Sequence, residues 1–101
     1  MKICKEMIKL REGLDERGIV WIDASGTYGD DKIKDLGIDI TIYRTHFTAY
    51  DVWFSVIYGH GTYGNKSGLL ECMSNAVDES GEPKGSMTAD EILEVIDGLK
   101  V

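Results

Sequence analysis

Residues 59–64 carry the pattern in this sequence that is most typical of ligand binding. Their sequence, Gly-His-Gly-Thr-Tyr-Gly, matches GxGxxG and directly follows an apolar run that we expect to be a strand. In dinucleotide-binding folds, such glycines let the backbone approach a phosphate at the start of a helix. Here residues 65–68 separate the pattern from any helix, and no later strand completes a β-α-β unit. The context disfavours a dinucleotide fold and favours a glycine-rich loop, which either covers a ligand or only connects two elements.

A second pattern is the tetrapeptide Gly-Thr-Tyr-Gly, which occurs at 26–29 and again at 61–64. Each copy follows a predicted strand. If both loops lie at one edge of the sheet, they gather hydroxyl groups, backbone N–H groups and tyrosine rings. Such groups suit a nucleotide or another polar ring, and they also suit a protein interface. The simpler interpretation is two unrelated turns with similar turn chemistry.

Arg44 and His46 form a third candidate site, because they alternate along a predicted strand. An arginine guanidinium binds phosphate or carboxylate with a fixed fork, and His60 would join the site if the loops fold over it. The alternative is a polar strand end in water. The candidate ligand-binding or partner-binding residues of all three patterns are Thr27, Tyr28, Arg44, His46, His60, Thr62 and Tyr63.

Residues for catalysis or metal binding do not form a recognisable set. The soft metal ligands are two cysteines, Cys4 and Cys72, and two histidines, and none has a CxxC or HxxxH spacing. No nucleophile, base and orienting group stand together, and there is no GxSxG elbow. We therefore expect a non-enzymatic protein without a metal or a cofactor.

Two helices are expected to frame the elements that position these residues. Apolar residues at steps of three and four predict an N-terminal helix that ends at Gly18. Thr88 and Glu91 have the spacing of a capping box, which predicts the start of a C-terminal helix.

The segments between the helices predict a small sheet. β-Branched and aromatic residues favour strands, and residues 49–51 are short enough for a hairpin connection. Arg44 and His46 are expected near the end of the middle strand. We expect one α+β domain over 1–101, with an antiparallel sheet of three to four strands and both helices packed on one side. The predicted strands are residues 19–22, residues 38–43 with their continuation, and residues 52–58. Residues 69–77 fit either a helix or a fourth strand. Residues 78–86 are expected to form a polar loop.

Bulk composition limits the partners. The chain has 101 residues and a formal net charge of −7, from 11 basic and 18 acidic residues. A negative surface repels nucleic acid and anionic membranes at long range, so neither is an expected partner. No apolar run approaches the ~20 residues of a membrane span, and the cysteines fit reduced thiols, so we expect a cytoplasmic protein.

Several segments resemble a family of small uncharacterised proteins from phages and prophages of Gram-positive gut bacteria. The resemblance spans most of the chain and implies a mobile-element origin. It implies no activity, because none is established for that family. The segments are LREGLDERG at 10–18, RTHF at 44–47, SVIYGHGTYG at 55–64, GLLE at 68–71, GEP at 81–83 and TADEI at 88–92.

The resemblance to phage and prophage proteins implies an accessory protein that binds and antagonises a host factor, in particular a defence component. One mechanism is an acidic, tyrosine-bearing surface that seals a basic groove on a host protein. Another is capture of a small phosphorylated or nucleotide ligand by the glycine/tyrosine loops with Arg44. A structural or assembly accessory that forms a homo-oligomer, and an enzyme using His46 or His60, are the remaining hypotheses.

Overall fold

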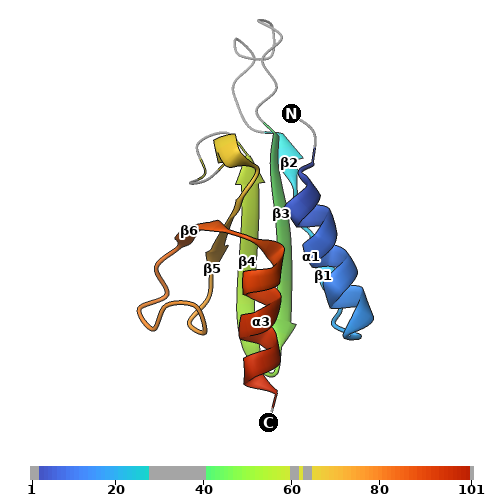
Figure 1. The fold of residues 1–101 in the computed structure, drawn as a ribbon, viewed down its shortest axis with the longest axis vertical. Helices are drawn as coiled ribbons and strands as arrows, with labels where there is room; N and C mark the ends of the chain where they lie inside the picture. Colours follow the sequence, from blue (N-terminus) through green and yellow to red (C-terminus); the bar gives the residue numbers. More distant parts are fainter. Residues whose placement is uncertain (1–2, 28–40, 60–61, 63–64, 101) are drawn as a thin grey trace, which may run out of the picture.

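The computed structural model describes residues 3–27, 41–59, 62 and 65–100. Two α-helices and one antiparallel sheet make up this part of the chain, which confirms the predicted α+β class (Figure 1). The elements in chain order are α1 (Lys5–Glu16), β1 (Trp21–Asp23), β2 (Gly26–Thr27), β3 (Thr41–Ala49), β4 (Val52–Gly59), the 3₁₀ turn η1 (Asn65–Ser67), β5 (Leu70–Met73), β6 (Lys84–Met87) and α3 (Ala89–Leu99).

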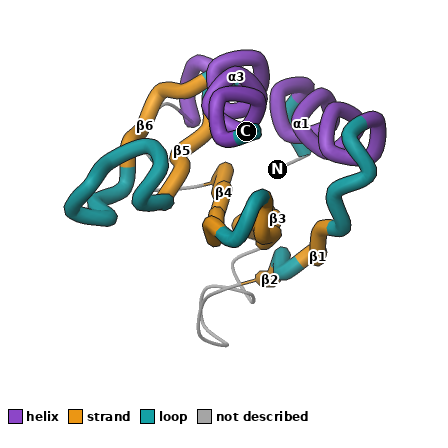
Figure 2. The backbone as a smooth tube through the Cα atoms, turned by 90° about the horizontal axis from the view of Figure 1, so that it is seen from below, coloured by secondary structure: helices purple, strands orange, loops and turns teal. Residues whose placement is uncertain are grey.

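The sheet has the strand order β1-β3-β4-β5-β6, and β2 pairs with β3 farther along the same edge as β1. Every pairing is antiparallel. Both helices cover one face of the sheet and lie side by side, as Figure 2 shows from below. Among the described residues, the other face carries no helix.

α1 stops and α3 starts where the sequence predicts. Gly18 has a φ of +68°, and the backbone N–H groups of Gly18 and Ile19 donate to the carbonyls of Asp15 and Leu14 at 3.0 and 2.9 Å. This is the Schellman arrangement, which glycine permits because it has no Cβ. At α3, the Thr88 hydroxyl accepts from the Glu91 N–H, and the Glu91 carboxylate accepts from the Thr88 N–H, so the capping box is confirmed.

The core lies between the helices and the inner face of the sheet. Alternate residues of β3 and β4 point inward, and the rings of Phe47 and Phe54 stack with centroids 4.8 Å apart. On the helical side, α1 and α3 approach closely at Gly13, where a Cβ would lie 2.5 Å from Leu93 Cδ1. The fully buried side chains that fill the space include Met7, Leu10, Leu14, Phe54, Val56, Leu70, Ile92 and Ile96.

The β3–β4 hairpin is also confirmed. Ala49 pairs with Val52, which leaves Tyr50 and Asp51 as a two-residue connection. Both have positive φ, 50° and 66°, as a type I′ turn requires. Since β4 pairs with β3 on one side and β5 on the other, it is the central strand that its apolar sequence predicts.

Three expectations need correction, and one open alternative is decided. The sheet has more strands than the three to four predicted. Arg44 and His46 lie in the middle of β3 and not near its end, because the strand continues through the buried residues Phe47 and Ala49. Residues 70–73 are a strand, which decides against the helical alternative for this segment. The expected polar loop contains β6, a strand that buries only Met87 along its length and is defined by its pairing with β5.

Candidate functional site

The face of the sheet opposite the helices is the candidate site, and we call it the open face. Because strand register is known, its side chains can be assigned to rows that run across the strands. One row is Ile22, His46, Ser55 and Met73, a second is Thr48 and Trp53, and a third is Arg44, Ile57 and Glu71. The rows draw on β1, β3, β4 and β5.

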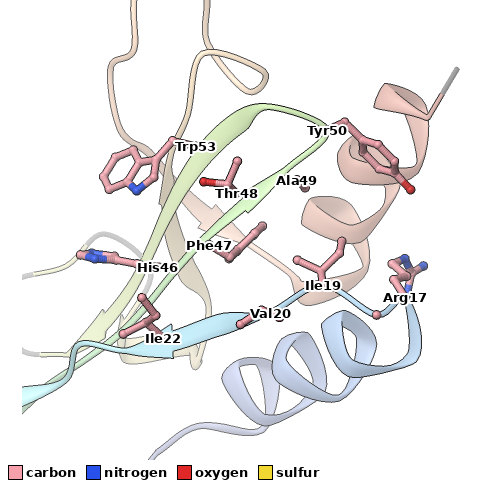
Figure 3. Close-up of a pocket in the computed structure, with 11 residues that line it drawn as sticks. Arg17, Ile19, Val20, Ile22, His46, Phe47, Thr48, Ala49, Tyr50 and Trp53 are labelled. Atoms are coloured by element: carbon pink, nitrogen blue, oxygen red, sulfur yellow. The ribbon is translucent and has the colours of Figure 1, made fainter.

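Large apolar side chains are exposed along this face. Ile22 is 66% exposed, Trp53 48% and Met73 37%, and Val20, just before β1, is 84% exposed. Figure 3 shows Ile22, His46 and Trp53 projecting to the same side of the sheet, away from the helices. The His46 and Trp53 rings lie 5.4 Å apart at 57°. The result is a contiguous aromatic and aliphatic surface.

A groove of about 290 Å³ crosses the open face. Trp53, His46 and Met73 provide apolar and aromatic walls, and Arg44 and Glu71 add one charge of each sign. Ser55, Ile57 and Pro83 complete the lining. A small groove of mixed character suits the side chains of another protein better than it encloses a whole nucleotide.

A second recess lies beside the first, at the β1 edge. The first pair of residues between β1 and β3 is Trp21 and Phe47. The residues before Trp21 leave the sheet and lead back to α1. The gap between residues 18–20 and 48–50 has a volume of about 600 Å³ (Figure 3). His46 and Trp53 line both recesses, so the two form one continuous surface, and Ile22 lines the second.

Among the described residues in its three rows, the open face carries one charge of each sign. Arg44 and Glu71 stand on either side of Ile57 in one row. Burial and, to a smaller extent, the nearby Arg44 charge lower the pKa of His46 below its usual value, which favours the neutral imidazole. A phosphate in the groove would therefore meet the Arg44 guanidinium, which attracts it, and the Glu71 carboxylate, which repels it.

The backbone that carries these residues is held from the helical side by Arg11 on α1. Its side chain is 14% exposed, and its guanidinium donates to Thr45 Oγ1 at 2.9 Å and to Asp23 Oδ1 at 3.2 Å. The same guanidinium lies 4.7 Å from the Trp21 ring centroid. One side chain thus ties α1 to β1 and to the centre of β3, directly beneath Arg44 and His46.

The residues predicted from the Gly-Thr-Tyr-Gly loops are only partly placed. Tyr28, His60 and Tyr63 lie outside the described residues. The predicted meeting of the two loops therefore also concerns residues that the structure does not describe. Thr27 ends β2, opposite Thr41. Thr62 is 7% exposed, and its hydroxyl donates to the Gly59 carbonyl at 2.7 Å and accepts from the Gly59 N–H at 3.1 Å. The described role of Thr62 is therefore to close the turn after β4.

Gly59, the first glycine of the GxGxxG pattern, has a structural explanation. It belongs to β4 and pairs with Ile42. A Cβ at this position would lie 2.7 Å from the Thr41 carbonyl oxygen and 3.0 Å from Ile42 Cα. The glycine is needed for close approach of two strands, which explains it without a phosphate.

Ile22, Trp53, Ile57 and Met73 belong to the site but were not among the predicted contact residues. The sequence held one signal for them, because β4 has apolar residues on both of its faces. The same pattern predicts a central strand, which β4 is. Only the position of the helices reveals that the second apolar face is open.

No match is found when the chain is compared with family models, curated proteins and solved structures. In the described part of the chain, no helix has the length and apolar character needed to cross a membrane. The same residues contain no group of three or more histidine, cysteine, aspartate or glutamate side chains placed to hold a metal ion.

Proposed function

We propose that this protein acts by binding another protein, without catalysis, and that the open face is its docking surface. The observation that carries the proposal is the exposure of Ile22, Trp53 and Met73 together on a sheet face that no described helix covers. Single exposed apolar residues are common on monomers, but a contiguous patch marks an interaction site.

The composition of the face supports a protein partner. The centres of protein interfaces are enriched in aromatic residues, methionine and arginine and are poor in other charges. The open face has Trp53, His46, Met73 and Arg44, and Glu71 is the one carboxylate in its three rows. Trp53 and Arg44 are also of the types that dominate binding energy at such surfaces.

Two other mechanisms have less support. Among the described residues, a phosphorylated ligand in the groove would face Glu71 as well as Arg44, and the lowered pKa of His46 favours its neutral form, so this lining gives such a ligand little net positive charge. Acidic mimicry would use the carboxylates of the helices. Two of these are engaged by the chain itself, since Lys9 contacts Asp90 at 2.8 Å and Arg17 contacts Asp97 at 2.7 Å.

The nature of the partner rests on the resemblance to phage and prophage proteins. Small accessory proteins of mobile elements commonly act by occupying a host protein, so we propose that the partner is a host factor, in particular a defence component. A host protein with an apolar, weakly charged surface fits the open face. This part of the proposal depends on association with a family and not on the geometry.

The proposal can be tested by affinity capture from a host-cell lysate with matched substitutions. Ile22→Ser and Trp53→Ala change the open face, and Ile8→Ser makes the same chemical change at an apolar residue of α1 that is 42% exposed. We expect quantitative mass spectrometry to find a protein that is captured by the unchanged chain and by Ile8→Ser. The open-face variants should lose most of it, because they remove interface contacts.

Circular dichroism of each variant provides the folding control. A partner that is lost equally from Ile8→Ser, or that is retained by Ile22→Ser and Trp53→Ala, would show that binding uses another surface. Absence of any enriched protein would remove the proposal.

A further inference from the structure

The β1 edge of the sheet has main-chain groups that no described residue uses. Main-chain groups alternate in direction along an antiparallel pair, and the Ala24 N–H donates to the Arg44 carbonyl at 2.9 Å. Ala24 and Ile22 therefore turn their main-chain groups toward β3. Trp21 and Asp23 alternate with them, so their N–H and carbonyl groups point outward from the sheet. Figure 2 shows β1 at the outer edge of the sheet, next to α1.

The opposite edge of the sheet, β6, is built differently. Ser86 has a φ of +57°, and the pairing of β6 with β5 shifts register between Leu70 and Cys72. Such irregularities disfavour pairing with a further strand, and proteins use them to protect sheet edges. β1 keeps a regular register with β3 over its whole length, and none of its residues has a positive φ. Of these two edges, β1 is the one that can accept a further strand.

A recess of about 400 Å³ lies beside this edge, between the end of α1 and β1. Asp15, Trp21 and residues 18–20 line it. The Trp21 Nε1–H donates to Asp15 Oδ1 at 2.8 Å, which holds the carboxylate beside the strand. This neutral donor is the one described partner of the Asp15 side chain, whereas Arg11, which lies against the Trp21 ring, pairs with Asp23 at 3.2 Å. Among the described residues, the recess therefore presents a negative charge without its own cation.

We propose that β1 accepts an extended segment of a partner protein as an added strand, with a basic side chain of that segment in the recess beside Asp15. Antiparallel addition pairs one residue of the segment with Trp21 and another with Asp23 through main-chain hydrogen bonds. The side chains of these two residues point to the α1 side of the sheet, as Trp21 does. A lysine or an arginine opposite Trp21 can therefore reach the Asp15 carboxylate, and the pair compensates both charges.

The next residue of the segment lies opposite Val20, on the other side of the added strand. Val20 is 84% exposed, so an apolar side chain at this position would remove it from water. The segment that fits best thus has a basic residue followed by an apolar residue. This surface goes beyond the docking function proposed above and does not depend on it, because it uses the edge of the sheet and neither Trp53 nor Met73.

A synthetic peptide, Thr-Thr-Arg-Val-Thr with acetyl and amide caps, tests the geometry on purified protein. Its arginine is placed to pair with Trp21 and its valine to cover Val20. We expect an NMR titration to show saturable binding, and hydrogen exchange of the Trp21 and Asp23 N–H groups to slow by about tenfold or more at saturation. The Ile22 N–H is the internal reference, because it already faces β3 and should not change.

Matched peptides separate the main-chain contribution from the charge. N-methylation of the arginine removes the N–H that points to Trp21 and should weaken binding by about tenfold or more. N-methylation of the valine, whose N–H points away from β1, should keep the affinity within about threefold. Glutamate in place of the arginine puts a like charge beside Asp15 and should weaken binding by about tenfold or more.

Two protein variants test the role of Asp15. Asp15→Asn keeps an oxygen that can accept from the Trp21 indole but removes the charge, so it should weaken the arginine peptide by about fivefold or more. It should not weaken the glutamate peptide. Glu94→Gln makes the matched change at an exposed carboxylate of α3 and should have no effect. Circular dichroism verifies that both variants are folded.

The added strand would be overturned by the absence of binding up to about 1 mM arginine peptide, or by protection that spares Trp21 and Asp23. Equal weakening by the two N-methylated peptides would also overturn it. If Asp15→Asn bound the arginine peptide as tightly as the unchanged chain, the basic residue in the recess would be wrong. None of these titrations contains a host protein, so their failure leaves the docking function standing, and failure of the lysate experiment leaves the added strand standing.

Discussion

At the scale of single residues, Arg11 shows how a charged side chain can organise a small core. Its hydrogen bond satisfies Thr45, whose hydroxyl is fully buried and also donates to Met7 Sδ at 3.2 Å. A buried hydroxyl that loses its partner costs free energy, whereas an exposed ion pair contributes little. Arg11 is therefore expected to contribute more to the free energy of unfolding than Lys9, although both join α1 to another element.

We predict that Arg11→Ala lowers the free energy of unfolding by about 2 to 3 kcal/mol, from the lost hydrogen bonds and the lost contact with Trp21. Arg11→Lys should keep only part of the effect, because an ammonium lacks the planar fork. Lys9→Ala, which removes the exposed contact with Asp90, should change stability much less. Urea unfolding curves measure all three, and equal losses at positions 9 and 11 would contradict the account.

The Cys72 thiol has a pKa well above that of a free thiol. Burial raises its pKa to about 12, whereas a thiol in an unfolded chain titrates near pH 8.5. Between these values the unfolded chain has lost the proton and the folded chain keeps it. The folded state then binds more protons, so its stability must fall as the pH rises through this window.

We predict that the Cys72 thiol lowers the free energy of unfolding by up to about 1.4 kcal/mol per pH unit above pH 9. Cys72→Ala should be less stable at pH 7, because it leaves a small cavity, but should show a flatter decline toward pH 11. Denaturant unfolding across this range measures the slope. Cys4→Ala is the comparison, since Cys4 is only half-buried and should account for less of the slope.

At the scale of elements, the β3–β4 hairpin forms although the two residues of its turn are not the types that favour the turn conformation. Tyr50 and Asp51 occupy left-handed backbone conformations that glycine and asparagine prefer. The register of the two strands nevertheless holds, because Phe47 stacks on Phe54 just inside the turn. Packing within the hairpin thus outweighs the unfavourable turn residues.

Asp51→Gly should raise the free energy of unfolding by about 1 kcal/mol, because glycine adopts the left-handed conformation without strain. For a domain of this length that corresponds to about 4 to 8 °C in melting temperature. Asp51→Ala removes the same carboxylate but keeps the Cβ, and it should give no such gain. A melting temperature raised equally by both would assign the effect to charge and not to backbone strain.

The elements also differ in how well they can be predicted from sequence. Gly18, Thr88 and Glu91 mark helix ends through local chemistry, and all three act as predicted. β6 has no such local marker, because its sequence Lys-Gly-Ser-Met shows no alternation and its strand conformation comes from pairing with β5. The residues of the candidate site also differ in how well they can be predicted from sequence. Arg44 and His46 were identified by residue type, but their apolar neighbours depend on which sheet face the helices leave open.

At the scale of the whole molecule, the two faces differ in character. The helices carry four acidic residues each, while the open face has a balanced pair of charges among aromatic and aliphatic side chains. A net charge of −7 cannot reveal this separation, because it sums over both faces. Because the acidic residues of the helices lie on the other side of the sheet, we predict that binding of a partner to the open face depends little on salt.

The neighbouring helices have a consequence for the synthesis of the chain. Contacts between the α1 and α3 regions join residues 80 to 83 positions apart, including Lys9 with Asp90, Arg17 with Asp97 and Glu6 with the Ala89 N–H. A ribosome adds 5 to 20 residues per second, so α1 waits roughly 4 to 16 s before α3 exists. During that interval Leu10 and Leu14 lack part of their native cover. The nascent chain then exposes apolar surface of the kind that chaperones bind.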